Sequence, residues 1–249
     1  MHPSFIALVS TCGGLLLLSI AACGDEGCDI DLAELSMVAA VVDDGRVVRA
    51  EVDFASGDRS TLPIPYRRCP DDEIRINGVD ALETIKTERV EYSLTVSPET
   101  APRTFSFEFV RPGDPPIEAT VTLPPAFDVT APLPGTPLPR AADVALTWEP
   151  AAPEDEMRIA LVETIDGAIC LTTPVAEHDY KSNIGVPVPD EGTWTIPAGA
   201  IVGNEGAACD AYLEFNRYAY GVYPEALTAA GLVEGRVVRR VYVVSTPAL

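Results

Sequence analysis

Apolar and polar residues alternate along much of the chain with a period of two, the pattern of a β-strand that buries one face. In Arg46–Phe54 every second residue from Val48 onward is apolar, and in Thr104–Phe109 three phenylalanines fall on one face. The Asp-Asp-Gly turn at 43–45 joins the first of these runs to Leu35–Val42. An Asp-Gly turn between such runs predicts a β-hairpin.

The prolines are densest between Pro124 and Pro139. Proline lacks the N–H that a central strand needs, so it suits linkers and sheet edges. We therefore expect a domain boundary here, near residue 128. Beyond it only Glu225–Leu232 fits a short helix. Further strands are expected at Asp143–Pro150, Met157–Thr164, Ala168–Thr172, Thr193–Ile196, Ala211–Tyr220 and Val237–Val244.

Recurrent strands separated by turn residues, with no long helical period, are typical of β-sandwiches and not of α/β enzymes. The pattern predicts an all-β fold with two tandem β-sandwich domains of immunoglobulin or fibronectin type. The first domain is expected over residues 28–127 and the second over residues 128–249. The chain is long enough for two domains of ordinary size.

Two stretches of the second half resemble strands of fibronectin type III domains. In Leu146–Pro150 a tryptophan would open the core, and Gly192–Gly199 is similar to a later strand that leads into a turn. Tyr218 or Tyr220 would then be the tyrosine of the following strand. The resemblance covers roughly residues 140–245, and a fold of this kind implies no activity.

The first 22 residues have the pattern of an export signal. Phe5–Ala22 carries no charged residue, and its most hydrophobic part, Leu15–Ile20, is shorter than the roughly 20 residues that cross a bilayer. The segment ends in the small residues Ala21 and Ala22. We expect residues 1–22 to be a cleaved signal peptide and not a permanent anchor.

The residues Ile20-Ala21-Ala22-Cys23 resemble the lipobox of bacterial lipoproteins. The resemblance implies that Cys23 becomes the first mature residue, with a diacylglycerol on its thiol and an acyl group such as palmitate on its amine. Residues 23–27 would form a lipid-anchored tether. Gly24 resembles the sorting pattern for the outer membrane of the bacterial cell envelope. The alternative is an ordinary secretory peptide that leaves Cys23 as a free thiol.

Four cysteines remain if Cys12 leaves with the signal peptide and Cys23 carries lipid. An even number in an exported chain is typical of disulfides. Three connectivities are possible, and the spacing favours the pairs Cys28–Cys69 and Cys170–Cys209, one in each half. A zinc site is the competing use, but the chain has no CxxC pair.

The formal net charge of −21 lies wholly after residue 22. It opposes binding to nucleic acid, whose phosphates would be repelled. It also opposes adsorption to an anionic membrane, so attachment has to come from the lipid.

Few residues could carry catalysis. His178 is the one histidine after the signal segment, and no HExxH, GxSxG, GxGxxG or GxxxxGK[ST] motif is present. We expect no catalytic residue, no metal and no cofactor. The acidic clusters lack the spacing of an EF-hand loop, and solvated turns explain them. These clusters are Asp25/Glu26/Asp29/Asp31, Asp71/Asp72/Glu73 and Glu154/Asp155/Glu156.

Five aromatic residues lie between positions 212 and 223. On a strand Tyr212, Tyr218 and Tyr220 would share one face, with Phe215 and Tyr223 on the other. Exposed tyrosines suit protein or sugar binding, and packing within the fold is the simpler use.

The sequence therefore predicts a non-catalytic lipoprotein of the cell envelope that acts as a binding or structural module, with an envelope protein or glycan as partner. One alternative is a lipid-anchored β-sandwich hydrolase that acts on polysaccharide through two carboxylates or His178. The other is a calcium-dependent adhesion module.

Overall fold

The computed structural model describes residues 28, 30–56, 64–86, 89–163, 170–172, 185–203 and 206–247. Within them the chain forms a single turn of 3-10 helix, η1 (Leu32–Glu34), followed only by strands. The strands are β1 (Leu35–Asp43), β2 (Val48–Ser56), β3 (Ile64–Pro65), β4 (Glu73–Ile76), β5 (Val79–Asp80), β6 (Leu82–Ile85), β7 (Val90–Val96), β8 (Thr104–Val110), β9 (Ile117–Thr122), β10 (Asp128–Ala131), β11 (Thr136–Pro139), β12 (Val144–Glu149), β13 (Glu156–Glu163), β14 (Leu171–Thr172), β15 (Val186–Pro189), β16 (Thr193–Ile196), β17 (Val202–Gly203), β18 (Cys209–Tyr220) and β19 (Leu232–Thr246).

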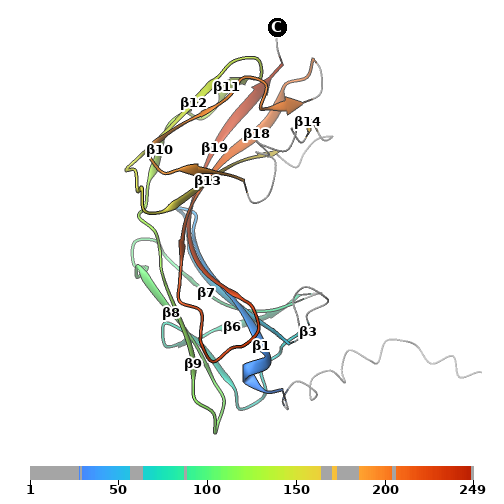
Figure 1. The fold of residues 1–249 in the computed structure, drawn as a ribbon, viewed down its shortest axis with the longest axis vertical. Coiled ribbons are helices and arrows are strands. Elements are labelled where there is room, and N and C mark those ends of the chain that lie inside the picture. The colour runs from blue at the N-terminus through green and yellow to red at the C-terminus, as the bar shows by residue number, and fades with distance from the viewer. Residues whose placement is uncertain are drawn as a thin grey trace, which may run out of the picture.

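The strands build two β-sandwich lobes, stacked end to end in an elongated molecule with a curved outline (Figure 1). In the first lobe β1, β2, β7 and β6 pack against the four-stranded sheet β5-β4-β8-β9. In the second lobe β15, β13, β18 and β19 pack against β10-β12-β16. The prediction of an all-β fold with two sandwiches is confirmed.

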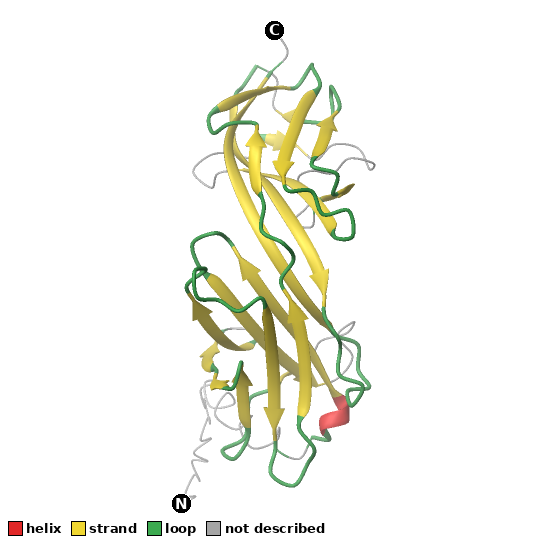
Figure 2. Ribbon diagram, turned by 90° about the vertical axis from the view of Figure 1, so that its left-hand side faces the viewer, coloured by secondary structure: helices red, strands yellow, loops and turns green. Residues whose placement is uncertain are grey.

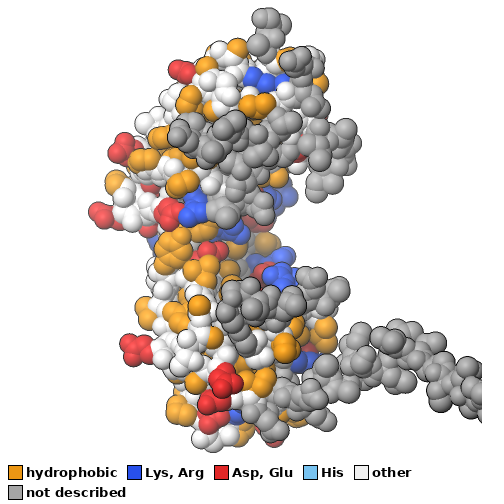
Figure 3. All heavy atoms as spheres, turned by 45° about the vertical axis from the view of Figure 1, so that its right-hand side comes forward, with side chains coloured by type: hydrophobic (Ala, Val, Ile, Leu, Met, Phe, Trp, Pro, Cys, Tyr) orange, Lys and Arg blue, Asp and Glu red, His pale blue; other side chains and the backbone are white. Residues whose placement is uncertain are grey.

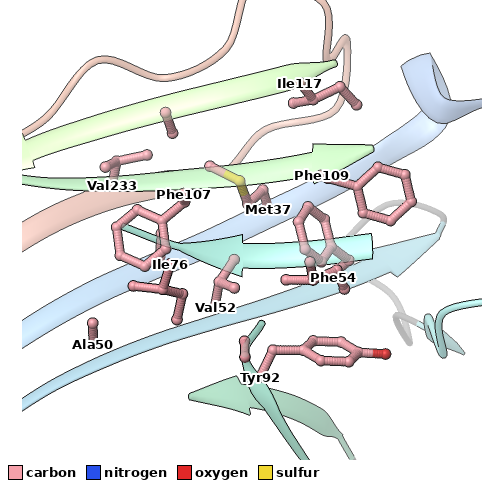
Figure 4. Close-up of a cluster of buried hydrophobic side chains, with 14 of the residues drawn as sticks. Met37, Ala50, Val52, Phe54, Ile76, Tyr92, Phe107, Phe109, Ile117 and Val233 are labelled. Atoms are coloured by element: carbon pink, nitrogen blue, oxygen red, sulfur yellow. The ribbon is translucent and has the colours of Figure 1, made fainter. Parts of the chain in front are cut away.

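The core of the first lobe lies between its two sheets (Figure 4). The three phenylalanines of β8 are buried on one face, as their spacing predicts. The predicted hairpin is also present, because β1 and β2 pair antiparallel with Met37 opposite Phe54. The rings of Phe54 and Phe109 lie 5.2 Å apart between centroids. A shift of one residue in the register would turn this apolar set out of the core.

The core of the second lobe is centred on Trp148 of β12. This side chain is buried, as the resemblance to fibronectin type III domains implied, and its ring lies 5.8 Å from that of Phe215 on β18. The proline-rich stretch is not a bare linker. It contains β10 and the edge strand β11, which pairs only with β19 among the described strands.

One sheet runs through both lobes (Figure 2). β18 and β19 pair antiparallel along the full length of β18. The first half of β19 also pairs parallel with β1, from Val38 opposite Leu232 to Asp43 opposite Val237. Its last residues pair parallel with β11. The described sheet has ten strands and extends from β15 in the second lobe to β6 in the first.

The shared sheet changes which residues belong to each lobe. The two cores divide between Leu123 and Phe127, next to the expected boundary at residue 128. Leu227 and Val233, however, were expected in the second domain and pack in the first core. The physical reason is that β19 begins beside β1, so the segment that leads into it has to cover the first lobe.

The short helix expected at Glu225–Leu232 is wrong, because the structure has turns there and β19 begins at Leu232. This segment bonds to the first lobe: both the amide and the hydroxyl of Thr228 donate to the carbonyl of Ala33, at 2.9 and 2.7 Å. A Cβ on Gly231 would lie 2.1 Å from the carbonyl oxygen of Met37, so only glycine allows this close approach.

A buried ion pair ties the connection between the lobes to the second lobe. Arg217 of β18 donates from Nε to Oδ2 of Asp190 at 2.5 Å, and both side chains are completely buried. Its terminal nitrogens donate to the carbonyls of Pro125 at 2.8 Å and Pro150 at 2.6 Å. Trp148 Nε1 donates to Oδ1 of Asp190 at 2.6 Å. Both charges therefore have the hydrogen bonds that burial demands.

A second arginine connects this joint to the first lobe. Arg239 of β19 donates from Nε to the carbonyl of Phe127 at 3.1 Å and from Nη1 to the carbonyl of Asp43 at 3.3 Å. The guanidinium groups of Arg217 and Arg239 lie 4.6 and 5.8 Å from the centroid of the Phe127 ring. Because Asp43 ends β1 and Phe127 opens the second core, these contacts restrain the angle between the lobes.

Among the described residues, no helix has the length and apolar character needed to cross a membrane.

Candidate functional site

The cysteines that the sequence analysis paired are bonded to each other. The disulfides Cys28–Cys69 and Cys170–Cys209 place one covalent bond in each lobe, and the pairing favoured by the spacing is confirmed. Cys23, which is expected to carry the lipid, and His178 lie outside the described residues.

The acidic clusters do not form a metal centre in the described part of the chain. No group of three or more His, Cys, Asp or Glu side chains there is placed to hold a metal ion. Asp72 pairs with Arg111 and Glu156 pairs with Arg158. These charges are used inside the fold.

A polar network fixes the chain next to the first disulfide. Arg111 donates from Nε to Oδ1 of Asp72 at 3.0 Å, from Nη2 to the hydroxyl of Tyr66 at 2.5 Å and from Nη1 to the carbonyl of Ile30 at 2.8 Å. Tyr66 and the amide of Cys69 both donate to Oδ2 of Asp72. Burial opposes ionisation of Asp72, but the hydrogen bonds from Arg111 and Tyr66 hold the pKa of its carboxyl below the ordinary value.

This network should make part of the stability depend on acid pH. A carboxyl whose pKa is lowered by folding contributes stability above its unfolded pKa of about 3.9, and the contribution is lost as the pH falls through the folded pKa. We expect Asp72→Asn to be less stable than the wild type at neutral pH, and the difference to shrink below about pH 4. Urea unfolding of both proteins across the acid range measures it. A difference that stays constant down to about pH 2 would contradict the role of Asp72.

The first lobe has a shallow cleft of about 480 Å³ near η1. Ile30, Leu32 and Ile117 are among its apolar lining residues, and Asp31 and Asp114 bring two carboxylates. Asp31 uses its Oδ1 to accept from the amide of Ala33 at 3.0 Å and so caps η1. The cleft is therefore an open surface depression in which Asp31 has a structural role. It does not hold two carboxylates in a buried pocket as an acid–base pair would require.

The tyrosines of β18 lie as their spacing predicts, with Tyr212, Tyr218 and Tyr220 on the outer face of the ten-stranded sheet and Phe215 in the core. Tyr218 is buried by two arginines, since the guanidinium carbons of Arg158 and Arg236 lie 5.5 and 5.7 Å from its ring centroid.

Basic side chains gather on this face at the waist between the lobes (Figure 3). Most of them are neutralised locally: Arg158 pairs with Glu156, and Arg240 pairs with Glu214 at 2.6 Å. The hydroxyl of Tyr220 donates to Glu156 at 3.1 Å. At the waist Tyr218 is therefore packed between arginines, whereas Tyr220 is exposed and bonded to Glu156, and these charges form internal pairs.

The strongest candidate for a contact surface is the side of the first lobe formed by residues 79–85, which we name the open edge. β5 ends one sheet there and β6 ends the other. The apolar side chains of Val79, Leu82 and Ile85 are 52, 70 and 60% exposed. Monomeric proteins rarely leave an apolar strand at a sheet edge without protection, because such an edge pairs with other chains.

Charge distinguishes the open edge from the rest of this acidic protein. Glu83 is shared by Arg67 at 3.0 Å and Arg68 at 3.4 Å. On the neighbouring strand β7, Glu91 is shared by Lys86 at 2.5 Å and Arg89 at 2.9 Å. Four basic side chains therefore surround Glu83 and Glu91, and the open edge has one further acid, Asp80 on β5, in a chain whose acidic residues outnumber the basic ones by 38 to 17.

Sequence reasoning missed the open edge. Residues 79–85 carry no motif and follow a tight turn at Asn77-Gly78, where φ is positive at both residues. The one available signal was the concentration of basic residues at 67, 68, 86 and 89 in an acidic chain.

No protein family matches the chain, and no curated protein matches it. Solved structures that align with it include the two immunoglobulin domains of DIP-gamma, with 8% identity, 87% of this chain and 98% of that chain covered, and a TM-score of 0.22. A mutant of Salmonella alpha-2-macroglobulin aligns with 14% identity over 88% of this chain and 16% of its own, with a TM-score of 0.26. A tandem of titin domains aligns with 12% identity over 85% of this chain and 66% of its own, with a TM-score of 0.21.

Proposed function

We propose that this chain is a lipid-anchored binding module of the bacterial cell envelope, without catalysis of its own, and that it engages a partner protein through the open edge. The observation that carries the proposal is the combination found at and beside residues 79–85: strand edges that no other described strand covers, three exposed apolar side chains and four basic side chains. Such a surface is costly to leave in water unless a partner covers it.

The anchor part of the proposal follows from the lipobox and the first disulfide. With Cys28 bonded to Cys69, a lipid on Cys23 would be joined to the first lobe by the four residues Gly24–Gly27. That tether spans at most about 18 Å. The first lobe, with its open edge, would lie close to the membrane, and the second lobe would project away from it. The Gly24 pattern supports the outer membrane as the location.

The local chemistry supports binding over catalysis. The two carboxylates at the cleft are not buried against each other, and Asp31 caps a helix. The buried ion pair of Asp190 and Arg217 is saturated by structural partners. Asp72 is likewise engaged by Arg111, Tyr66 and the amide of Cys69.

The proposal can be tested in cells with a photoreactive amino acid at Leu82 of the full-length chain. We expect light to produce a discrete crosslinked species from Leu82. The matched control is Leu133, which is 67% exposed but lies in the second lobe. We expect no such species from Leu133, because exposure alone does not create a binding site.

The Cys23→Ser variant tests the anchor in the same cells. Without the thiol that accepts the lipid, the protein should leave the membrane fraction, lose palmitate labelling and lose the Leu82 adduct. Equal adducts from Leu82 and Leu133 would exclude the open edge as the binding surface. A Cys23→Ser protein that stays in the membrane fraction would exclude the lipid anchor.

A further inference from the structure

The backbone of β6 has hydrogen-bonding groups that point away from its sheet. β6 pairs only with β7 among the described strands, in an antiparallel register that places Ile85 opposite Val90. The amide of Lys86 donates to the carbonyl of Arg89 at 2.9 Å. In an antiparallel ladder bonded and non-bonded pairs alternate, so the groups of Thr84 face β7 and those of Ile85 and Glu83 face outward.

The other end of the same sheet is protected in a way that β6 is not. β15 has the sequence Val-Pro-Val-Pro, so Pro187 and Pro189 have no N–H to offer a further strand. β6 has the sequence Leu-Glu-Thr-Ile and contains no proline. Among the described strands, one sheet thus has a closed end in the second lobe and an end in the first lobe beside which no further strand lies.

The side chains beside β6 define the chemistry of a strand that would fit there. Leu82 and Ile85 offer exposed apolar contacts on opposite faces, because neighbouring residues of a strand alternate. Lys86 and Arg89 lie at one end of β6, and Arg67 and Arg68 reach Glu83 from the adjoining segment. An added strand with alternating apolar and acidic residues would place its apolar side chains near Leu82 and Ile85 and its acidic side chains near the four basic ones.

We propose, on the basis of the binding function above, that the open edge accepts an extended acidic segment of a partner protein as an additional strand beside β6. Backbone hydrogen bonds to Glu83 and Ile85 would hold the segment, Leu82 and Ile85 would contact its apolar residues, and the four basic side chains would select acidic residues. This is recognition by strand addition, in which the main chain supplies affinity and side chains supply specificity.

The proposal can be tested with capped, fluorescein-labelled octapeptides and the purified chain, both disulfides intact. One peptide alternates valine with glutamate, and the control alternates valine with lysine. Fluorescence anisotropy should show saturable binding of the glutamate peptide and at least about tenfold weaker binding of the lysine peptide. The preference should fall in the double variant Lys86→Gln/Arg89→Gln, because complementary charge is removed.

Two substitutions at one residue separate backbone pairing from simple apolar contact. Ile85→Ala removes most of the side chain and keeps the outward N–H, whereas Ile85→Pro removes both. The proline variant should bind the glutamate peptide a further three- to tenfold more weakly, roughly the value of one backbone hydrogen bond. Circular dichroism of both variants verifies that the fold is kept.

Equal binding of the two peptides, or equal binding by Ile85→Ala and Ile85→Pro, would overturn strand addition by an acidic segment. The Leu82 crosslinking experiment in cells shows whether only strand addition fails or the proposed binding function fails as well. A Leu82 adduct with no peptide binding would leave the binding function standing and refute the acidic strand. The absence of both would remove the two proposals together.

Discussion

Replacing Arg217 with methionine should lower the free energy of unfolding by about 3–5 kcal/mol, because Asp190 would remain buried as a charge without its partner. Arg217 and Asp190 are completely buried, and the arginine also binds the carbonyls of Pro125 and Pro150. Urea unfolding at neutral pH with intact disulfides measures the loss. Methionine keeps most of the volume of the side chain, so the effect reports the charge and not a cavity.

The double variant Arg217→Met/Asp190→Leu is the control for this prediction. Removing both charges should recover roughly half or more of the lost stability, since an apolar pair of similar volume often replaces a buried ion pair without great cost. The carbonyls of Pro125 and Pro150 and the indole N–H of Trp148 would account for the remainder. If the double variant loses as much stability as the single variants Arg217→Met and Asp190→Leu lose in sum, the two charges are not coupled as described.

Removing the first disulfide with Cys28→Ser/Cys69→Ser should cost about 4 kcal/mol in the chain-entropy description, because the bond closes a loop between residues 41 positions apart. Replacing both cysteines avoids a free thiol that could form new bonds. Chemical unfolding of this variant and of the wild type gives the difference. Palmitate labelling at Cys23 should be unchanged, because the lipid and the disulfide use different cysteines.

The second disulfide is the matched control, since it spans 39 positions in the other lobe. Cys170→Ser/Cys209→Ser should lower stability by a similar amount, because its loop has nearly the same length. A Cys28→Ser/Cys69→Ser protein that loses palmitate would refute the proposal that Cys23 carries the lipid independently of the Cys28–Cys69 disulfide. If Cys28→Ser/Cys69→Ser lowers the free energy of unfolding by less than about 1 kcal/mol, the network of Tyr66, Asp72 and Arg111 holds the chain around Cys69 without the disulfide.

Local features were predicted well because their causes lie within a few residues. The phenylalanines of β8 and the hairpin of β1 and β2 follow from a two-residue period and an Asp-Gly turn. The disulfide pairs followed from spacing, and the burial of Trp148 from a short resemblance. The helix expected near Glu225 failed because its backbone groups bind the first lobe, a contact that local propensity does not contain.

Long-range pairings were not predictable in the same way. β1 lies beside β19 although Val38 and Leu232 are nearly two hundred residues apart, and no sequence period marks that partnership. The burial of Arg217 against Asp190 also depends on three segments meeting. From sequence alone, arginine and aspartate are predicted to be surface residues, because both are rarely buried in folded proteins.

The sequence by itself determined the strand content and the fold class, and it favoured one of three disulfide pairings and a lipid at Cys23, since each depends on residue type and spacing along the chain. Only the tertiary structure decided that the two lobes share one sheet, that Arg217 is buried at their joint and that β6 is left as an open end. The reason is physical: a strand carries its own alternation of apolar and polar faces, but its neighbours are chosen by the packing of the whole chain. The pairing of the strands therefore decides which strand lies at the edge and which charged side chains lie beside it.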